Sequence, residues 1–282
     1  MLRKSLILVL TGALTGLFSS ISQGAETLSV ATDAIAADFY PATQAGPQYG
    51  VLVLGGAEGG KPESLAKAIA HEGHPVLSLA YFNDKGLPQE LEQIPLEYFA
   101  KAKVWLLNQA NVRQDGLILV GWSKGAELSL LLASQDPLFS KVVAIAPSSV
   151  IWAGFLKDWT KTPSSSWTQG GKALDFVPFR PTGEVKGLLD LYSQSLQNAK
   201  AGQGRIPVEN IKGDVVLLTG SNDEIWPSNL MAKALCQRMD TAGTQGSCTH
   251  INFEGLDHLL GEKFLDSNDA MHKQFMGFLE AE

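Results

Sequence analysis

Residues 116–132 read GLILVGWSKGAELSLLL, an apolar run that passes through a glycine-flanked serine into a second run of helical composition. The pentapeptide Gly121–Gly125 has the pattern G-x-S-x-G, which is typical of a nucleophile elbow between a strand and a helix. In such an elbow the two glycines permit a tight turn, and the serine hydroxyl projects above the sheet. Ser123 is therefore a candidate nucleophile. An ordinary glycine-rich turn has the same short pattern, so the assignment depends on partners elsewhere in the chain.

Length and composition indicate one globular domain. The 282 residues are 45% hydrophobic and 18% charged, which is ample for a single α/β core and unlike a disordered chain. The formal net charge is -7, so the chain has no basic excess with which to neutralise nucleic-acid phosphates or an anionic membrane surface. We expect one domain over residues 25–282, a small-molecule substrate and no nucleic-acid partner.

Residues 1–24 have the pattern of a secretory signal peptide. Arg3 and Lys4 precede the uncharged stretch 5–22, and small residues precede Ala25 where a signal peptidase would cut. The alternative is an uncleaved membrane anchor, but the apolar part is shorter than the roughly 20 residues that span a bilayer. We expect a periplasmic or secreted protein with no membrane span after cleavage.

Two cysteines are present, and export would place them in an oxidising compartment. Cys236 lies in an expected helix, and Cys248 begins the next expected strand, a spacing that a disulfide can close across one turn. Two unpaired small hydrophobic side chains are the alternative. Nothing in the sequence resembles a metal-binding spacing, so neither a metal nor a cofactor is expected.

Strand-like and helix-like segments alternate along the chain. The expected strands cover residues 49–54, 76–81, 116–120, 142–145, 215–218 and 249–253. The expected helices cover residues 63–71, 91–108, 126–134, 229–239 and 270–279. Near-continuous apolar strands separated by helices indicate a parallel sheet covered on both faces. The predicted fold class is therefore α/β, with a mostly parallel, doubly wound sheet.

Residues 146–214 interrupt this alternation with a segment rich in Ser, Pro and Gly that has no clear strand. A connection of this length is uncommon unless it is functional. Its position just downstream of the elbow indicates a cap-like insertion whose aromatic residues form an apolar pocket. Trp152 and Trp159 of this segment, together with Trp226, are the candidate pocket residues. The alternative is a crossover whose tryptophans pack on the edge of the sheet.

The candidate nucleophile requires a base, because a serine hydroxyl attacks poorly unless its proton is accepted. In an α/β-hydrolase the nucleophile is followed by an acid and then by a histidine, on loops after successive strands. Asp223 follows the expected strand 215–218, and His258 follows the expected strand 249–253. Parallel strands end at the same edge of a sheet, so both loops are expected beside Ser123.

Other residues compete for these two roles. Of the five histidines, only His258 follows a late strand in a loop that contains a glycine, and the others are assigned to structural or solvated positions. Glu224 and Asp257 compete with Asp223 for the role of the acid. Asp257 is adjacent to His258, and neighbouring side chains usually point apart, so Asp223 is preferred. An aspartate that only stabilises a turn is the alternative for Asp223.

Attack on a carbonyl also requires two backbone N–H groups that bind the developing oxyanion. Lys124, the residue after the nucleophile, is expected to supply one. The glycine-rich turn at residues 55–60 is expected to supply the other, from Ala57 or alternatively from Glu58. This turn lacks the patterns of phosphate and dinucleotide loops, so a nucleotide site is disfavoured.

Several motifs agree in order and spacing with a known family, and they lie at residues 56–60, 79–82, 87–88, 94–99, 123–128, 206–209 and 220–223. Over roughly residues 50–279 the chain resembles the C-terminal catalytic domain of the acyl-CoA thioesterase and bile acid-CoA:amino acid N-acyltransferase family. This resemblance implies an α/β-hydrolase fold and triad positions at Ser123, Asp223 and His258. It implies transfer of an acyl group from a thioester to water or to an amine.

Three features differ from that family. Its animal members have a β-sandwich domain before the catalytic one, whereas only about 25 residues separate the expected signal peptide from the first expected strand. Its acyltransferase branch has a cysteine nucleophile, so Ser123 favours hydrolysis. An exported enzyme would meet little coenzyme A. We therefore expect a serine hydrolase of thioesters or carboxylic esters, with acyl transfer to an amine, or a non-catalytic binding protein, as alternatives.

Overall fold

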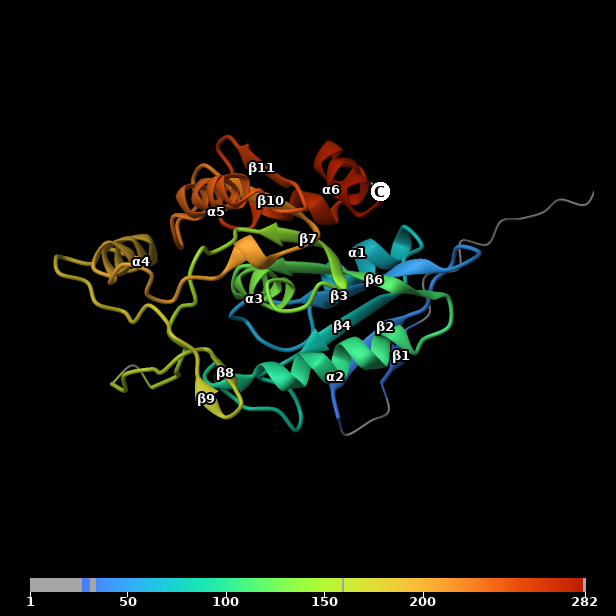
Figure 1. The fold of residues 1–282 in the computed structure, drawn as a ribbon, viewed down its shortest axis with the longest axis horizontal. Coiled ribbons are helices and arrows are strands. Elements are labelled where there is room, and N and C mark those ends of the chain that lie inside the picture. Colours follow the sequence, from blue (N-terminus) through green and yellow to red (C-terminus); the bar gives the residue numbers. More distant parts are fainter. Residues whose placement is uncertain (1–26, 31–33, 159, 281–282) are drawn as a thin grey trace, which may run out of the picture.

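The computed structural model describes residues 27–30, 34–158 and 160–280. Its centre is an eight-stranded sheet in the order β1-β2-β4-β3-β6-β7-β10-β11 (Figure 1). The strands of this sheet are β1 (Leu28–Ser29), β2 (Ala36–Tyr40), β3 (Gln48–Leu54), β4 (Val76–Ala80), β6 (Val112–Trp122), β7 (Phe139–Ile145), β10 (Asp214–Gly220) and β11 (Cys248–Phe253). Neighbouring strands in the part of the sheet ordered β4-β3-β6-β7-β10-β11 pair in parallel. At one edge, β2 pairs antiparallel with both β1 and β4.

Helices cover both faces of the sheet. They are α1 (Glu63–His71), α2 (Leu96–Leu107), α3 (Lys124–Ala133), α4 (Leu188–Gln197), α5 (Ser228–Ala242) and α6 (Ala270–Glu280), with short 3₁₀ turns η1 (Val208–Asn210) and η2 (Leu260–Leu265). Leu52 and Leu54 of β3 pack in the cluster that includes α2, α3 and α5, whereas Val51 and Val53 pack in the cluster with α1 and α6. Because side chains alternate between faces, a strand buried on both sides is apolar throughout. The expected doubly wound α/β fold is confirmed.

The helix expected over residues 91–108 begins later, at Leu96. Ile94 precedes a proline, which disfavours the helical conformation, and Gln93 has a positive φ of 54°. Ile94–Pro95 instead form the short strand β5, which pairs with β8 (Trp167–Gln169). The sequence patterns also missed β2, because a strand of five residues that contains Asp38 shows no long apolar run.

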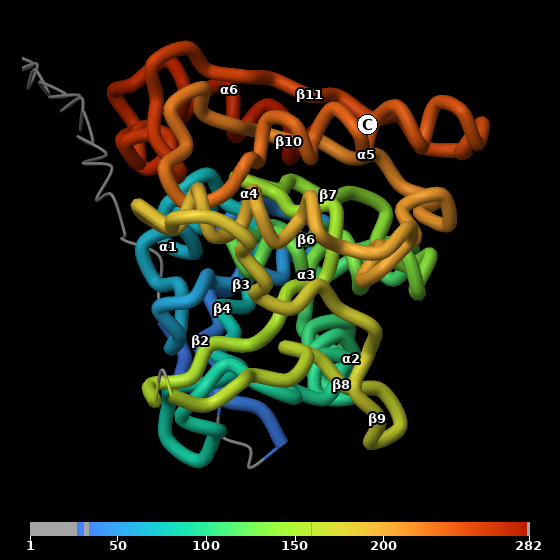
Figure 2. The backbone as a smooth tube through the Cα atoms, turned by 90° about the vertical axis from the view of Figure 1, so that its left-hand side faces the viewer, coloured from blue at the N-terminus to red at the C-terminus, as the bar shows by residue number. Residues whose placement is uncertain are grey.

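The segment 146–214 contains more regular structure than expected. Strand β8 pairs with β9 (Lys172–Ala173) and β5 in a small three-stranded sheet, and the segment ends beyond helix α4. It lies on the left-hand side of Figure 1, and Figure 2 shows α4 in front of the central strands when viewed from that side. The expectation that this segment has no strand is therefore wrong, because three-residue strands have no periodicity that can be read in sequence.

Other expectations concern the chain ends and the cysteines. The expected signal peptide at residues 1–24 lies outside the described residues. No helix within the described ranges has the length and apolar composition that a bilayer crossing requires. Cys236 of α5 and Cys248 of β11 are joined by a disulfide, with Cα atoms 5.2 Å apart.

Candidate active site

Strand β6 leads into a strained turn at Ser123. This residue has φ 52° and ψ -119°, a conformation that costs a non-glycine residue free energy and is held by its surroundings. Its N–H donates to the carbonyl oxygen of Ile145 at 2.9 Å, and α3 begins at the next residue. A Cβ on Gly121 would lie 2.3 Å from the Gly125 oxygen, and a Cβ on Gly125 would lie 2.2 Å from the Leu54 oxygen. Only glycine fits at both positions, which explains the G-x-S-x-G pattern.

His258 and Asp223 form a buried hydrogen-bonded pair. His258 Nδ1 lies 2.8 Å from Asp223 Oδ1. The same oxygen accepts N–H groups from Ile225 at 2.9 Å and Trp226 at 3.1 Å, and Asp223 Oδ2 accepts the Ser228 hydroxyl. An ionised carboxylate only accepts hydrogen bonds, so Nδ1 carries the proton and Nε2 is free to act as a base. His258 Nε2 is buried and has no hydrogen-bond partner among the described residues.

The two competing acids are occupied elsewhere. Glu224 Oε2 accepts the backbone N–H of His258 at 3.2 Å. Asp257 Oδ1 accepts the backbone N–H of Gly261 at 2.7 Å. Asp223 is therefore the carboxylate that orients the imidazole of His258.

Ser123 and His258 line one cavity, with a volume of about 210 Å³. Its walls come from the turn after β3, the elbow, the segment 146–214 and the loops after β10 and β11. The lining residues are Ala57, Glu58, Trp122, Ser123, Lys124, Phe155, Leu188, Tyr192, Ile225, Trp226, His258 and Leu259. The carboxyl ends of the parallel strands thus bring the candidate nucleophile and base to one apolar pocket.

The two residues expected to bind an oxyanion both line this cavity. Lys124 is the first residue of α3, where backbone N–H groups have no intrahelical acceptor. Ala57 lies in the turn after β3. The preceding N–H, that of Gly56, is occupied, because it donates to Glu58 Oε1 at 2.8 Å. The candidate donors are therefore the N–H group of Lys124 and that of Ala57, with the N–H of Glu58 as the alternative to Ala57.

Glu58 has a side-chain role that the sequence analysis missed. Besides the Gly56 N–H, its Oε1 atom accepts the indole Nε1–H of Trp122 at 2.7 Å. The carboxylate therefore connects the turn after β3 to the elbow. The available signal was an acid inside a glycine-rich turn, but its indole partner lies 64 residues away in the chain.

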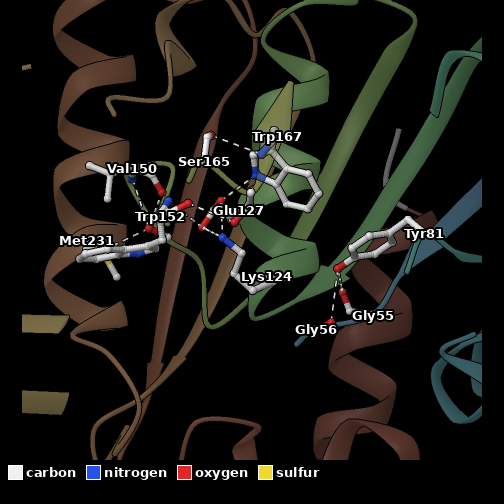
Figure 3. A network of polar contacts seen from close by, with 12 residues as sticks. Gly55, Gly56, Tyr81, Lys124, Glu127, Val150, Trp152, Ser165, Trp167 and Met231 are labelled. Carbon is white, nitrogen blue, oxygen red and sulfur yellow. Dashed lines mark hydrogen bonds and ion pairs between the residues drawn. The ribbon is translucent and has the colours of Figure 1, made fainter. Parts of the chain in front are cut away.

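A buried ion pair lies in the first turn of α3, the helix that follows the elbow (Figure 3). Lys124 Nζ lies 2.7 Å from both carboxylate oxygens of Glu127. Glu127 also accepts the indole Nε1–H of Trp167 at 2.7 Å and the backbone N–H of Trp152 at 3.4 Å. Burial lowers the pKa of Lys124 and raises the pKa of Glu127, and the pairing opposes both shifts. The network fastens the segment 146–214 to the helix that follows the nucleophile.

The glycine turn is also held from its other side. The Tyr81 hydroxyl donates to the Gly55 oxygen at 2.6 Å and reaches the Gly56 oxygen at 3.3 Å (Figure 3). Burial raises the pKa of Tyr81 well above its usual value, so the hydroxyl stays a donor. The turn that carries Ala57 is therefore fixed to Tyr81, the residue that follows β4, as well as to the elbow.

The predicted pocket residues have different positions. Trp226 lines the cavity, its ring centroid is 5.4 Å from that of His258, and its Nε1–H donates to the Ala146 oxygen at 3.2 Å. Trp152 is fully buried behind the wall, edge-on to Tyr192 at 4.7 Å, so the expectation that Trp152 lines the pocket is wrong. Trp159 lies outside the described residues. Phe155, Leu188 and Tyr192 are the residues of the segment 146–214 that line the cavity. The sequence could not identify them, because this segment has no periodicity that shows which side chains face the cavity.

The remaining histidines lie away from this cavity. His250 Nε2 contacts the Thr219 hydroxyl at 2.8 Å, and His272 Nδ1 contacts the Phe264 oxygen at 2.8 Å. His74 is buried, and His71 is exposed. Within the described ranges, no three or more His, Cys, Asp and Glu side chains are grouped as metal ligands would be.

Comparison with known proteins gives consistent relatives. Residues 94–277 match the family model described as "BAAT / Acyl-CoA thioester hydrolase C terminal". The chain is 32% identical to mouse acyl-coenzyme A amino acid N-acyltransferase 1, over 76% of this chain and 49% of that protein. It is 31% identical to human mitochondrial acyl-coenzyme A thioesterase 2, over 70% of this chain and 40% of that protein. The chain thus spans about half the length of the curated relatives it matches or less.

Solved structures show the same fold at low sequence identity. An esterase/lipase from an uncultured bacterium aligns with a TM-score of 0.59 and 15% identity, over 92% of this chain and 84% of that one. A putative dienelactone hydrolase from Klebsiella pneumoniae aligns with a TM-score of 0.53 and 14% identity, over 88% of this chain and 93% of that one. At these identities the likeness concerns the fold alone.

Proposed function

The chain belongs to the family of BAAT and acyl-CoA thioester hydrolase C-terminal domains, and from this premise we propose that it is a serine-dependent hydrolase of thioesters or carboxylic esters. The observation that supports this most directly is the pair of His258 and Asp223, which shares one cavity with the strained Ser123. A nucleophile, an oriented base and two candidate oxyanion donors are the groups that acyl transfer requires.

In the proposed mechanism Ser123 Oγ attacks the acyl carbon while His258 Nε2 takes its proton. The carbonyl oxygen gains negative charge, which the N–H groups of Lys124 and Ala57 bind. Asp223 stabilises the imidazolium. As the tetrahedral intermediate collapses, the bond to the leaving group breaks and His258 returns the proton to it. A water molecule, deprotonated by His258, then attacks the acyl carbon of the acyl-serine. The bond from that carbon to Ser123 Oγ breaks, His258 returns the proton to Oγ, and the acid is released.

Transfer to an amine is the second candidate, because the relatives include acyl-coenzyme A amino acid N-acyltransferases. The same acyl-serine would be attacked by an amine in place of water. The acyltransferase branch of the family that this chain resembles has a cysteine nucleophile. Because position 123 is a serine, we favour water over an amine as the acyl acceptor. The ratio of free acid to amide formed with glycine present would decide between them.

Ser123→Ala is the direct test of the proposed function. We expect the wild-type protein to hydrolyse p-nitrophenyl esters or acyl-CoAs, and the variant to lose at least about 10³-fold in kcat. Ser134→Ala is a matched control, because it removes a buried hydroxyl at the end of the same helix, away from the cavity. Full hydrolysis by Ser123→Ala would refute the serine mechanism. Ligand binding without turnover in both proteins would identify a binding protein instead.

We also propose that the protein is exported and loses residues 1–24. The composition of this stretch supports the proposal. Expression in a bacterium with cell fractionation, followed by N-terminal sequencing, should give a periplasmic protein that begins at Ala25. A full-length protein that stays in the cytosolic fraction would refute export.

A further inference from the structure

The candidate oxyanion donors belong to two different segments. The N–H of Lys124 belongs to the elbow at residues 121–125, whereas that of Ala57, or alternatively of Glu58, belongs to the glycine turn at residues 55–60. Two donors stabilise an oxyanion only when both lie within hydrogen-bond distance of the position that it takes. The placement of the glycine turn relative to the elbow is therefore part of the candidate site.

The glycine turn has few side chains with which to hold its own conformation. Four of its six residues are glycines, and Gly59 and Gly60 have positive φ angles of 71° and 70°. Glycine has no side chain to pack, and it loses more conformational freedom on folding than any other residue. Contacts with residues outside the turn are therefore needed to fix it.

Two of these contacts come from the segment that follows β4. The Tyr81 hydroxyl donates to the Gly55 oxygen at 2.6 Å (Figure 3), and Asn83 Nδ2 donates to the backbone oxygen of Glu58 at 3.1 Å. Strands β4 and β6 pair with β3 on opposite sides, and the elbow follows β6. Both contacts thus hold the glycine turn on the side away from the elbow.

Glu58 supplies the contact on the side of the elbow. Its Oε1 atom accepts the Gly56 N–H at 2.8 Å and the indole Nε1–H of Trp122, the residue before Ser123, at 2.7 Å. Within the described ranges, the indole contact is the only side-chain hydrogen bond between the glycine turn and the elbow. Trp122 is buried. One carboxylate oxygen thus holds both the conformation of the turn and its position beside the nucleophile.

Building on the proposed hydrolase function, we propose that Glu58 is a positioning residue for the oxyanion donors. Through Trp122 it holds the turn, and with it the N–H of Ala57, at the distance from the Lys124 N–H that a tetrahedral intermediate requires. This role needs an acceptor oxygen at the position of Oε1, and it does not need the negative charge. Because the oxyanion develops only in the transition state, a displaced donor slows the chemical step and leaves substrate binding nearly unchanged.

Steady-state kinetics of variants with one p-nitrophenyl ester tests this role. Glu58→Ala removes the acceptor, and we expect kcat to fall about 10²-fold while KM stays close to the wild-type value. Glu58→Gln retains an acceptor oxygen and should keep most of the wild-type kcat. Adding Trp122→Phe to Glu58→Ala should cause no further loss, because both changes break the same bond. The control is Glu97→Ala, which removes an exposed glutamate that accepts the Gly170 N–H at 2.7 Å and does not line the cavity.

Backbone order parameters of Gly56 and Ala57, from nitrogen NMR relaxation, give a second measurement that needs no turnover. They should be about 0.85 in the wild type and in Glu58→Gln, the value of rigid backbone, and should fall toward about 0.6 in Glu58→Ala. Wild-type kcat in Glu58→Ala, or equal losses in Glu58→Ala and Glu58→Gln, would overturn the inference while leaving the hydrolase function intact. If the wild type cleaves no ester, the proposed hydrolase function fails, and unchanged order parameters in Glu58→Ala would then overturn the inference separately.

Discussion

His258 Nδ1 lies 2.8 Å from an oxygen of Asp223 that two backbone N–H groups already hold in place. The carboxylate is therefore oriented by the loop after β10 before it meets the imidazole. This relationship separates two contributions of Asp223, its charge and its geometry. Asparagine at position 223 keeps an oxygen that can accept from the N–H groups of Ile225 and Trp226 and from His258 Nδ1, but it removes the charge. Alanine removes both the oxygen and the charge.

We predict that Asp223→Ala lowers kcat by about 10⁴-fold and that Asp223→Asn lowers it less. The N–H groups of Ile225 and Trp226 hold the amide oxygen of asparagine toward Nδ1, so the tautomer of His258 is retained while the charge is lost. Steady-state kinetics with one p-nitrophenyl ester measures both variants. Wild-type activity in Asp223→Ala, or a larger loss in Asp223→Asn, would contradict this account.

Glu127→Gln is predicted to destabilise the fold strongly. The substitution keeps an acceptor for the Trp167 indole but leaves the fully buried ammonium of Lys124 without its counter-charge. Removing one partner of a buried ion pair costs about 3–5 kcal/mol of the free energy of unfolding. Urea denaturation measures this change.

The matched control is Glu63→Gln in α1, which breaks an exposed ion pair with Lys67. Exposed pairs contribute about 0–1 kcal/mol, so this variant should unfold close to the wild-type midpoint. Similar losses in Glu127→Gln and Glu63→Gln would show that the buried network contributes no more than a surface pair.

Stability is predicted to fall as the pH is lowered from about 7.5 to 5.5, with His74 contributing to this slope. Burial lowers the pKa of His74, and neither ring nitrogen has a hydrogen-bond partner among the described residues. The unfolded chain then binds the proton more readily, so the stabilisation is complete above the unfolded pKa of about 6.5 and declines as the pH falls toward the folded pKa. Burial lowers the pKa of His250 too, which adds to the slope.

His74→Leu should flatten the dependence of the unfolding free energy on pH, whereas His71→Leu should preserve it. His71 is exposed, three residues earlier in the chain. Urea titrations of the three proteins at pH 5.5, 6.5 and 7.5 give the slopes. A slope that is identical in His74→Leu and the wild type would exclude protonation of His74 as a cause.

Loss of the disulfide is predicted to lower the free energy of unfolding by about 3 kcal/mol, because the bridge restricts the entropy of the unfolded chain by closing a short loop. The bridge joins residues 12 apart in sequence, Cys236 and Cys248. A thiol reductant should lower the thermal midpoint of the wild type and have no effect on Cys236→Ser/Cys248→Ser. If the reductant shifts both proteins equally, it acts elsewhere than on this bridge.

The sheet was predictable where a strand is buried on both faces. Residues 49–54 and 215–218 are almost wholly apolar because each strand packs against helices on either side, and such runs stand out in sequence. The strand Ala36–Tyr40 was missed, because Asp38 in its middle, which forms an ion pair with Lys61 at 2.7 Å, interrupts the apolar pattern. Nothing local distinguishes this five-residue stretch from a loop.

The sequence by itself determined the elbow. The strained turn at Ser123 requires glycine at positions 121 and 125, where any Cβ would meet backbone atoms. The order of nucleophile, acid and histidine along an α/β-hydrolase chain then pointed to Asp223 and His258. Because parallel strands end at the same edge of the sheet, both loops were expected beside Ser123. The elbow follows from backbone sterics within five residues, and the positions of the two loops follow from the common direction of the parallel strands. Both properties can be recognised in short stretches of sequence.

Only the tertiary structure decided which other side chains meet around this site. Glu58 is joined to Trp122 across 64 residues, and Glu127 to Trp167 across 40. Such contacts depend on how the segment 146–214 and the loops fold over the sheet, and no periodicity in the chain encodes them. For this reason the nucleophile could be identified from five residues. The contact of Glu58 with Trp122 and the ion pair of Lys124 with Glu127 could be found only in the folded structure.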